Sequence, residues 1–443
     1  MHEFDARSAR DRGSDLKNSF RQISGSICAP RGFKCAAVFC DIKKLGTGKG
    51  SEKGRKDDLA LIVSDVRAAV AGMFTTNQVC AAPVQISRQR AARKFARAIM
   101  VNSGNANAAT GAQGMKDAHH MTRLVARALS INENDVLVCS TGRIGVPMPM
   151  KNVERGIRAC VPRIARSTSS ARQVAEAIMT TDTRRKEVSV EFRIGGSIVR
   201  IGGICKGAGM IQPGMATMLG FITTDAAIVP AGLKRALKIA VQQSFNRITV
   251  DGDMSTNDSV IALASGLAKN HPIKPDRSKQ SSFQAALNYV CRELAKMIVR
   301  DGEGTSRVVR LHIRGARSDR EAESAARAIA NSSLVRASWC GGDPNWGRIL
   351  CALGYSKAKI DESKVDVSYA PTDSCKILFA FRRGRPTNVA LKRLAKITSE
   401  PEFDLHIDLH RGRGEFVIYA ADLTEDYVAF NKGDVNDPAT LGG

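Results

Sequence analysis

Short apolar runs alternate along the chain with longer stretches in which apolar residues recur at helical spacing. The runs Ala60–Val63, Ala98–Val101 and Val308–Ile313 end at polar or turn residues, which is typical of buried strands. Periodic spacing predicts helices over five ranges: Ala118–Leu129, Val153–Ala165, Arg172–Met179, Pro230–Gln243 and Gln284–Val299. Strands that alternate with helices indicate an α/β architecture.

Two glycine-containing stretches predict different local structures. Glu187–Ile201 alternates apolar and polar residues around Gly195 and Gly196, which predicts a β-hairpin. After the apolar run Gly32–Phe39, the stretch Lys43–Lys56 is dominated by glycine, lysine and other polar residues. Its glycines match neither phosphate-binding pattern, GxxxxGK[ST] or GxGxxG, so we expect an exposed surface loop rather than a phosphate site.

The length and apolar content predict a folded chain with more than one core. At 443 residues and 43% hydrophobic composition, two lobes or one large layered domain are expected. Residues 1–22 form a polar leader in which arginines are mixed with acidic residues, and it has no apolar segment of the kind that directs secretion. No apolar run is long enough for a membrane-spanning helix. We expect a cytoplasmic protein, or a mitochondrial matrix protein if the source is a eukaryote.

Cysteine usage and charge exclude several classes of protein. The 11 cysteines are scattered without a CxxC pair, which favours reduced thiols over a disulfide framework. The net charge of +24 raises the question of nucleic-acid binding. The basic residues are spread along the chain, and neither zinc-finger spacing nor an aromatic RNA-binding motif accompanies them. Nucleic acid is therefore not expected as a partner.

One pattern near the end of the chain resembles a metal site. His406, Asp408 and His410 occupy alternate positions, opposite Leu405, Ile407 and Leu409. Any half-exposed strand shows such alternation, and no third histidine is nearby in the sequence. We expect no metal here.

Three segments are rich in glycine and small polar residues. Lys206–Asp225 (KGAGMIQPGMATMLGFITTD) reads as neither a clean strand nor a clean helix. Val101–Gly111 and Cys139–Gly145 each follow a predicted strand, where α/β proteins commonly place binding groups. Thr141 and Gly142 could present a hydroxyl and a backbone N–H to an oxyanion, as acyl transfer requires. Tight turns would explain these segments equally well.

The ordered motifs of the chain resemble one family. KGAGMIQPGMATML is similar to the cleavage-site motif of the glutamate N-acetyltransferases, also called ornithine acetyltransferases, whose chains cut themselves before the threonine of an MAT tripeptide. The resemblance covers about residues 23–431 and includes, in order, DLALIVSD, NSGNANA, STG, AIMTTDT, DGDMSTND, DGEGTSR, GGDPNWGRILCALGYS and DLTEDYV. It implies an α/β layered sandwich with a second, smaller α/β lobe.

The resemblance also implies roles for individual residues. Thr217 would be the nucleophile, and cleavage between Ala216 and Thr217 would give an α chain, residues 23–216 after the leader, and a β chain, residues 217–443. Thr141 and Gly142 align with the pair that stabilises the oxyanion. The positions that align with the family's substrate-binding residues are Thr180, Lys206, Thr217, Glu303 and Asn431. Taken alone, Lys206 and Glu303 could equally be solvated surface charges, and Thr180 a turn residue.

The implied reaction needs no cofactor. The new N-terminal threonine would use its own α-amine as base. It would take acetyl from N-acetylornithine, release ornithine and pass the acetyl group to glutamate. Acetyl-coenzyme A is a second candidate donor on which the motifs are silent. The family's assembly implies a heterotetramer of two α and two β chains.

Three features depart from the family pattern. Gly214 stands where asparagine is usual, the chain continues beyond Asn431 as KGDVNDPATLGG, and the stretch Lys43–Lys56 is an insertion. A self-processed aminopeptidase or amidohydrolase, in which water accepts the acyl group, is the nearest alternative, because sequence does not reveal how well a site excludes water.

Overall fold

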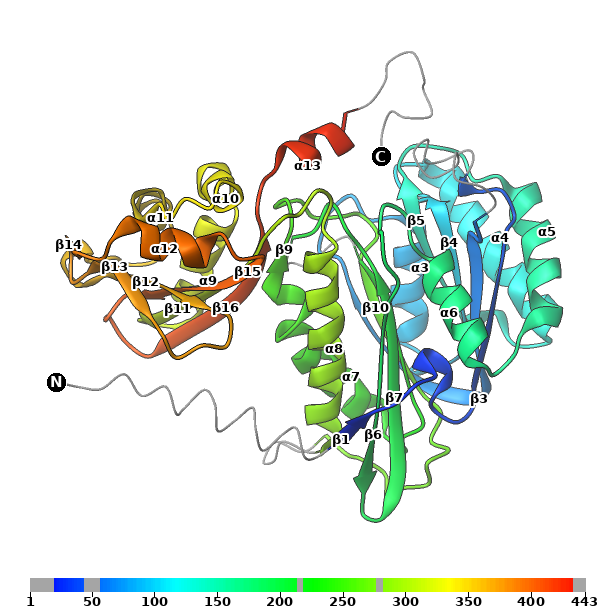
Figure 1. The fold of residues 1–443 in the computed structure, drawn as a ribbon. Helices are drawn as coiled ribbons and strands as arrows, with labels where there is room; N and C mark the ends of the chain where they lie inside the picture. The colour runs from blue at the N-terminus through cyan, green and yellow to red at the C-terminus, as the bar shows by residue number, and fades with distance from the viewer. Residues whose placement is uncertain (1–19, 44–55, 213–217, 276–281, 433–443) are drawn as a thin grey trace.

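The computed structural model describes residues 20–43, 56–212, 218–275 and 282–432, which form two lobes, each built on a mixed β-sheet (Figure 1). The larger lobe is formed mainly by the first two thirds of the chain, and the smaller by the last third. No helix in the described ranges is long and apolar enough to cross a membrane. All eleven cysteines lie in these ranges and are free thiols.

The sheet of the larger lobe has nine strands within the described residues, in the order β1-β6-β7-β8-β10-β3-β4-β5, with β2 paired to β3. Neighbours are antiparallel except for the parallel pairs β8/β10 and β4/β5. The strands are β1 (Phe20–Gln22), β2 (Phe33–Val38), β3 (Leu59–Phe74), β4 (Phe95–Asn105), β5 (Val136–Arg143), β6 (Lys186–Ile194), β7 (Ser197–Lys206), β8 (Leu219–Thr224) and β10 (Ser259–Ala264).

Helices cover both faces of this sheet. In β2, Cys35 and Ala37 point into one core and Ala36 and Val38 into another, so the two cores lie on opposite faces. The helix α6 (Thr168–Ala177) packs in the first core. On the other face lie α3 (Ala82–Ala91), α4 (Gly111–Leu129), α5 (Met150–Cys160), α7 (Pro230–Gln242) and α8 (Ser282–Arg300).

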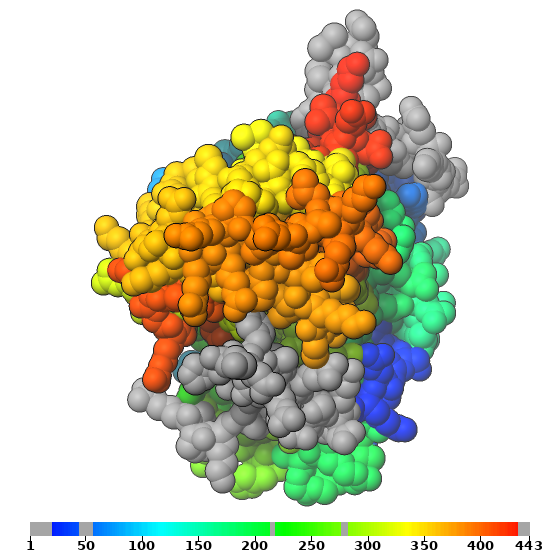
Figure 2. Space-filling model, turned by 60° about the vertical axis from the view of Figure 1, so that its left-hand side comes forward, coloured from blue at the N-terminus to red at the C-terminus, as the bar shows by residue number. Residues whose placement is uncertain are grey.

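The smaller lobe is a seven-stranded sheet, counted over the described residues, in the order β14-β13-β12-β15-β11-β16-β9. Its core packs helices against one face of β11 and β15. Figure 2 shows that this lobe presents a continuous surface, from whose upper edge α13 projects. The elements are β9 (Ile248–Thr249), β11 (Val308–Ala316), α9 (Asp319–Ala330), α10 (Ser333–Cys340), α11 (Trp346–Gly354), β12 (Asp366–Pro371), β13 (Leu378–Arg382), β14 (Arg385–Pro386), α12 (Leu391–Thr398), β15 (Glu402–Asp408), β16 (Gly414–Ala421) and α13 (Glu425–Phe430).

The periodic segments of the sequence form the predicted elements. The three apolar runs lie in the first part of β3, the centre of β4 and the first part of β11, and the helical ranges fall in α4, α5, α6, α7 and α8. The predicted hairpin joins β6 and β7, and its turn residues Gly195 and Gly196 have φ values of +53° and +86°. Two successive residues with positive φ favour glycine, which explains why the pair identified the turn.

Three local predictions are wrong. The helix expected over Val153–Ala165 ends at Cys160, because Pro162 lacks the N–H needed to continue it. The loop expected over Lys43–Lys56 is not exposed at its first residue. Lys43 is buried, and its Nζ donates to the carbonyl oxygen of Ala177 at 3.2 Å. Residues 44–55 of this loop lie outside the described ranges. The segment Lys206–Asp225 contains a regular strand, β8, since Leu219–Thr224 is wholly buried against neighbours on both sides.

Candidate active site

The carboxyl ends of β4 and β5 form a tight backbone feature around Gly142. Gly142 has a φ of +126°, and a Cβ there would lie 2.3 Å from the carbonyl carbon of Gly104. Only glycine fits such an approach. The preceding residue, Thr141, is buried on β5. The STG motif therefore places a threonine side chain and a glycine N–H at one strand end, which combines the tight-turn and donor interpretations of this segment.

Lys206, the last residue of β7, reaches this strand end. Its Nζ donates a hydrogen bond to Oγ1 of Thr141 at 3.2 Å, and only 3% of the residue is exposed. Burial lowers the pKa of Lys206, while the carboxylate of Asp182 opposes this shift. Lys206 is thus buried beside a carboxylate and is not the solvated surface charge that its type alone would suggest.

A buried ion cluster of Lys186, Asp182 and Asp301, which sequence reasoning missed, lies next to Lys206. Nζ of Lys186 donates to Oδ1 of Asp182 at 2.6 Å and to Oδ2 of Asp301 at 2.5 Å. Oδ1 of Asp182 also accepts the N–H of Gly207 at 2.7 Å, which fixes the backbone next to Lys206. Burial on its own would raise the pKa of Asp182, but Lys186 and Lys206 lower it to about 2. Asp182 is therefore an anion at neutral pH.

Glu303 and Asn431 meet in a second group of polar side chains. Nδ2 of Asn431 donates to Oε2 of Glu303 at 3.1 Å, and the N–H of Glu303 donates to the carbonyl oxygen of Ala208, two residues after Lys206. The carboxylate packs against Gly209, where a Cβ would lie 2.5 Å from its carbon. Burial raises the pKa of Glu303, and Lys206 is close enough to lower it.

Thr180 lies in the loop after α6, between the two groups. Its N–H donates to Oδ2 of Asp182 at 3.1 Å, and its neighbour Thr181 bonds to the Glu303 carboxylate through its side chain. Five of the predicted site residues thus come together from distant parts of the chain: Thr141, Gly142, Thr180, Lys206 and Glu303, with Asn431 at the exposed edge. Their functional roles stay predictions.

The predicted cleavage point, Ala216 and Thr217, lies outside the described residues. The backbone before and after it is hydrogen-bonded to two aspartates of the segment 251–258. Asp251 accepts the N–H groups of Met210 and Ile211 at 2.5 and 2.8 Å. On the other side, Oδ1 of Asp258 accepts the N–H of Met218 at 3.0 Å. Asp258 is fully buried, and burial raises its pKa well above the usual range. The DGDMSTND motif, whose separate residues gave no signal in the sequence, therefore anchors both sides of residues 213–217.

The predicted alternation of His406, Asp408 and His410 on one strand face is wrong at its last member. The strand β15 ends at Asp408, and His410 turns away with a φ of +47° to bring its Nε2 within 3.0 Å of Oδ2 of Asp366. His406 instead has a histidine neighbour from another strand: His312 of β11 lies directly beside it in the parallel ladder.

Comparison with known proteins identifies relatives over nearly the whole chain. The model of the ArgJ family matches residues 36–433. The arginine biosynthesis bifunctional protein ArgJ of Symbiobacterium thermophilum is 46% identical over 409 residues, which cover 92% of this chain and 98% of that protein. The protein of the same name from Shouchella clausii is 43% identical and covers 94% and 97%.

Two solved structures are also similar to the chain. The crystal structure of the arginine biosynthesis bifunctional protein argJ from Bacillus halodurans is 33% identical, with a TM-score of 0.40, and covers 45% of this chain and 97% of that chain. Ornithine acetyltransferase from Mycobacterium tuberculosis, solved in complex with ornithine, is 35% identical, with a TM-score of 0.39, and covers 44% and 98%.

Proposed function

The chain belongs to the ArgJ family and is an acetyltransferase of arginine biosynthesis, and from this premise we propose that it carries acetyl from N2-acetylornithine to glutamate through Thr217. The observation that carries the proposal is the buried contact of Lys206 with Thr141 at 3.2 Å. It joins a substrate-binding candidate to an oxyanion candidate. Lys206 also pairs with Leu219 of β8, and the residue before this strand, Met218, follows Thr217 directly in the chain.

The proposed reaction has two balanced steps. The hydroxyl oxygen of Thr217 attacks the acetyl carbonyl of N-acetylornithine while the free α-amine of the same residue takes the hydroxyl proton. The C–N bond breaks, the proton passes to the departing amine, and ornithine leaves. The amine of glutamate then attacks the acetyl ester, the threonine oxygen regains a proton, and N-acetylglutamate is released. No electrons enter or leave, so the scheme requires no redox cofactor, and the α-amine of Thr217 supplies the base.

Thr141 and Gly142 supply donors to the oxyanion that forms in both steps. Because Nζ of Lys206 donates the hydrogen bond to Thr141, this bond uses an oxygen lone pair of Thr141. The hydroxyl hydrogen of Thr141 is therefore left to point elsewhere, and we propose that it points at the oxyanion beside the N–H of Gly142. Both donors come from a fixed strand end, which reduces reorganisation during the reaction.

We propose that Lys206 and Glu303 recognise the charged groups of the amino-acid substrates. Replacing Lys206 with methionine is expected to lower kcat/KM by about 10²-fold, mostly through KM. The charged group of the substrate would then lose its buried partner. Glu303→Gln should have a smaller effect of the same kind. Steady-state kinetics with N-acetylornithine and glutamate measure both. Lys234→Met, on the exposed side of α7, is the matched control and should change neither constant. Wild-type KM values in both site variants would contradict the recognition role.

An acyl-exchange assay separates the proposed transfer from hydrolysis. Purified protein is incubated with N-acetylornithine, with and without glutamate, and ornithine and N-acetylglutamate are quantified. Transfer predicts equal amounts of both products and little ornithine without glutamate, whereas an amidohydrolase would release ornithine and acetate equally well in either case. Acetyl-coenzyme A in place of N-acetylornithine tests the second donor. We also propose two copies of each chain in the assembly, which light scattering of the same sample measures.

A further inference from the structure

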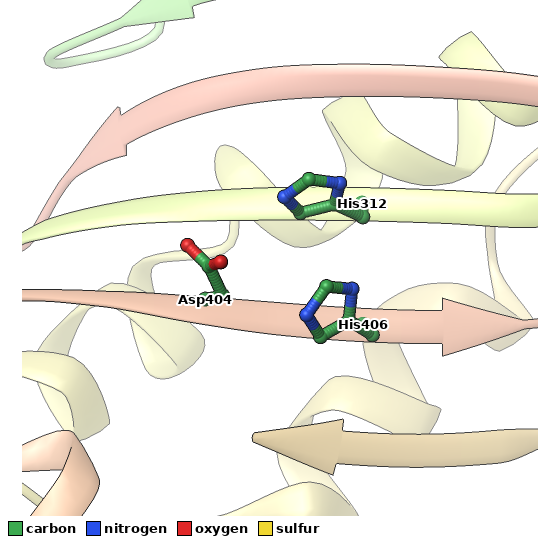
Figure 3. Close-up of side chains that lie close together, drawn as sticks. All are labelled: His312, Asp404 and His406. Carbon is green, nitrogen blue, oxygen red and sulfur yellow. The ribbon is translucent and has the colours of Figure 1, made fainter. Parts of the chain in front are cut away.

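Two histidines and an aspartate of the smaller lobe form a cluster distant in the fold from the acetyltransferase site. His312 on β11 and His406 on β15 face each other across the parallel ladder, with ring centroids 4.5 Å apart. Asp404 lies two residues before His406, so its side chain projects from the same face of β15. In Figure 3, one nitrogen of each ring points toward the Asp404 carboxylate. One ligand atom from each of the three side chains lies within 4.8 Å of the other two.

Each imidazole ring of this cluster has a nitrogen that is free to bind a ligand. Nε2 of His312 and Nε2 of His406 are both buried, and neither has a hydrogen-bond partner anywhere in the described structure. A buried polar atom without a partner is costly and commonly marks an absent water or ion. Burial lowers the pKa of His406 to about 4 and that of His312 well below its usual range. Burial thus disfavours the protonated form of both rings.

The surroundings of the cluster supply orientation and charge balance. Arg310 holds the Asp404 carboxylate with two N–H groups, one of them Nε at 2.8 Å from Oδ1. The backbone N–H of Asp373 also bonds to this carboxylate. Its two oxygens have four lone pairs between them, so three N–H groups leave one lone pair for a metal, and such outer hydrogen bonds orient metal-binding carboxylates. Arg310 also pairs with Asp373, and Arg314 lies 3.8 Å from Asp408. Each of the two arginines that act on the rings is thus paired with a carboxylate.

From this arrangement we propose that His312, His406 and Asp404 bind one divalent transition-metal ion, with Zn²⁺ as the reference ion. Two imidazoles with one carboxylate are ligands that zinc and its neighbours prefer over Mg²⁺ or Ca²⁺. Ligands held at about 2.1 Å from one ion lie about 3–4 Å apart, so side-chain movements of about 1 Å or less close the site. The ion joins β11 to β15, the central parallel pair of this sheet, and so stabilises the smaller lobe.

Metal titration of the full-length protein tests this site. After treatment with a chelator and dialysis, calorimetric titration with ZnSO₄ should show one strong site per 443-residue chain. At saturation the melting temperature should rise by about 3–5 °C. The double variant His312→Asn/His406→Asn should lose this site and the thermal shift. Asp404→Asn should weaken binding by at least about tenfold.

The other adjacent histidines provide the matched control. His119→Asn/His120→Asn changes the neighbouring pair on α4, which lies in the larger lobe, and should leave the strong site intact. If the His312/His406 variant does not fold, Co²⁺ binding to the wild type decides the question, since a site with few ligands gives intense visible absorption. Zinc binding that survives in a folded His312/His406 variant, or a wild type with no strong zinc site and no cobalt spectrum, would overturn the proposal. The outcome is independent of acetyltransferase activity.

Discussion

Replacing Thr217 with alanine is expected to leave one uncut 443-residue chain without acetyltransferase activity, whereas the wild type should separate into pieces of 216 and 227 residues. An internal threonine has no free α-amine, so the base that activates its hydroxyl would exist only after cleavage. Alanine removes both the attacking oxygen for cleavage and the acyl acceptor for transfer. Denaturing electrophoresis and intact-mass spectrometry measure the cleavage, and the acyl-exchange assay measures the activity.

The flanks of the cleavage point explain why the two pieces should stay together. Lys206 pairs with Leu219 in the antiparallel ladder of β7 and β8, so the strands on either side of the cut are neighbours in one sheet. Asp251 and Asp258 hold the backbone before and after residues 213–217. The native mass should therefore equal that of the uncut assembly, and the pieces should appear only in denaturant.

Thr217→Ser is the matched control for this prediction, since it keeps a hydroxyl at the same position. It should cut itself and retain part of the activity. Because Gly214 stands where the related motif usually has asparagine, cleavage of the wild type can be slow, and a mixture of precursor and pieces agrees with the proposal. A wild type that stays wholly intact while showing full activity would contradict it.

The pattern of the sequence predicted those elements that are determined by local signals, such as apolar spacing and turn residues. The helix α7 follows from apolar spacing and from Pro230 at its first turn, where the missing N–H is not needed. The β6–β7 hairpin follows from Gly195 and Gly196. The strand β8 was missed because it is buried on both faces, which removes the alternation by which a half-exposed strand is identified.

The residues of the candidate site could be predicted from the sequence, but their burial and ion-pair partners could not. Motif resemblance singled out Thr141 and Lys206, which lie 65 positions apart, and the structure brings them into contact. The burial of Lys206 could not be predicted, because it depends on Asp182 and Lys186. Lys186 in turn pairs with Asp301, which lies 115 positions away in the chain. Charged residues are mostly exposed, so residue type alone predicts the wrong environment for each member of this cluster.

Replacing Thr141 with alanine is expected to lower kcat for acetyl transfer by about 10² to 10³, the usual result of losing one oxyanion donor. KM should change little, because the hydroxyl acts on charge that develops only in the transition state. Ser140→Ala is the matched control: Ser140 is the buried neighbour on the same strand, and its hydroxyl bonds to Oδ1 of Asn102 at 2.6 Å on the opposite face. That variant should lose stability but keep kcat. A folded, fully cleaved Thr141→Ala protein with the kcat of the wild type would remove Thr141 from the oxyanion role and leave the N–H of Gly142 to supply it.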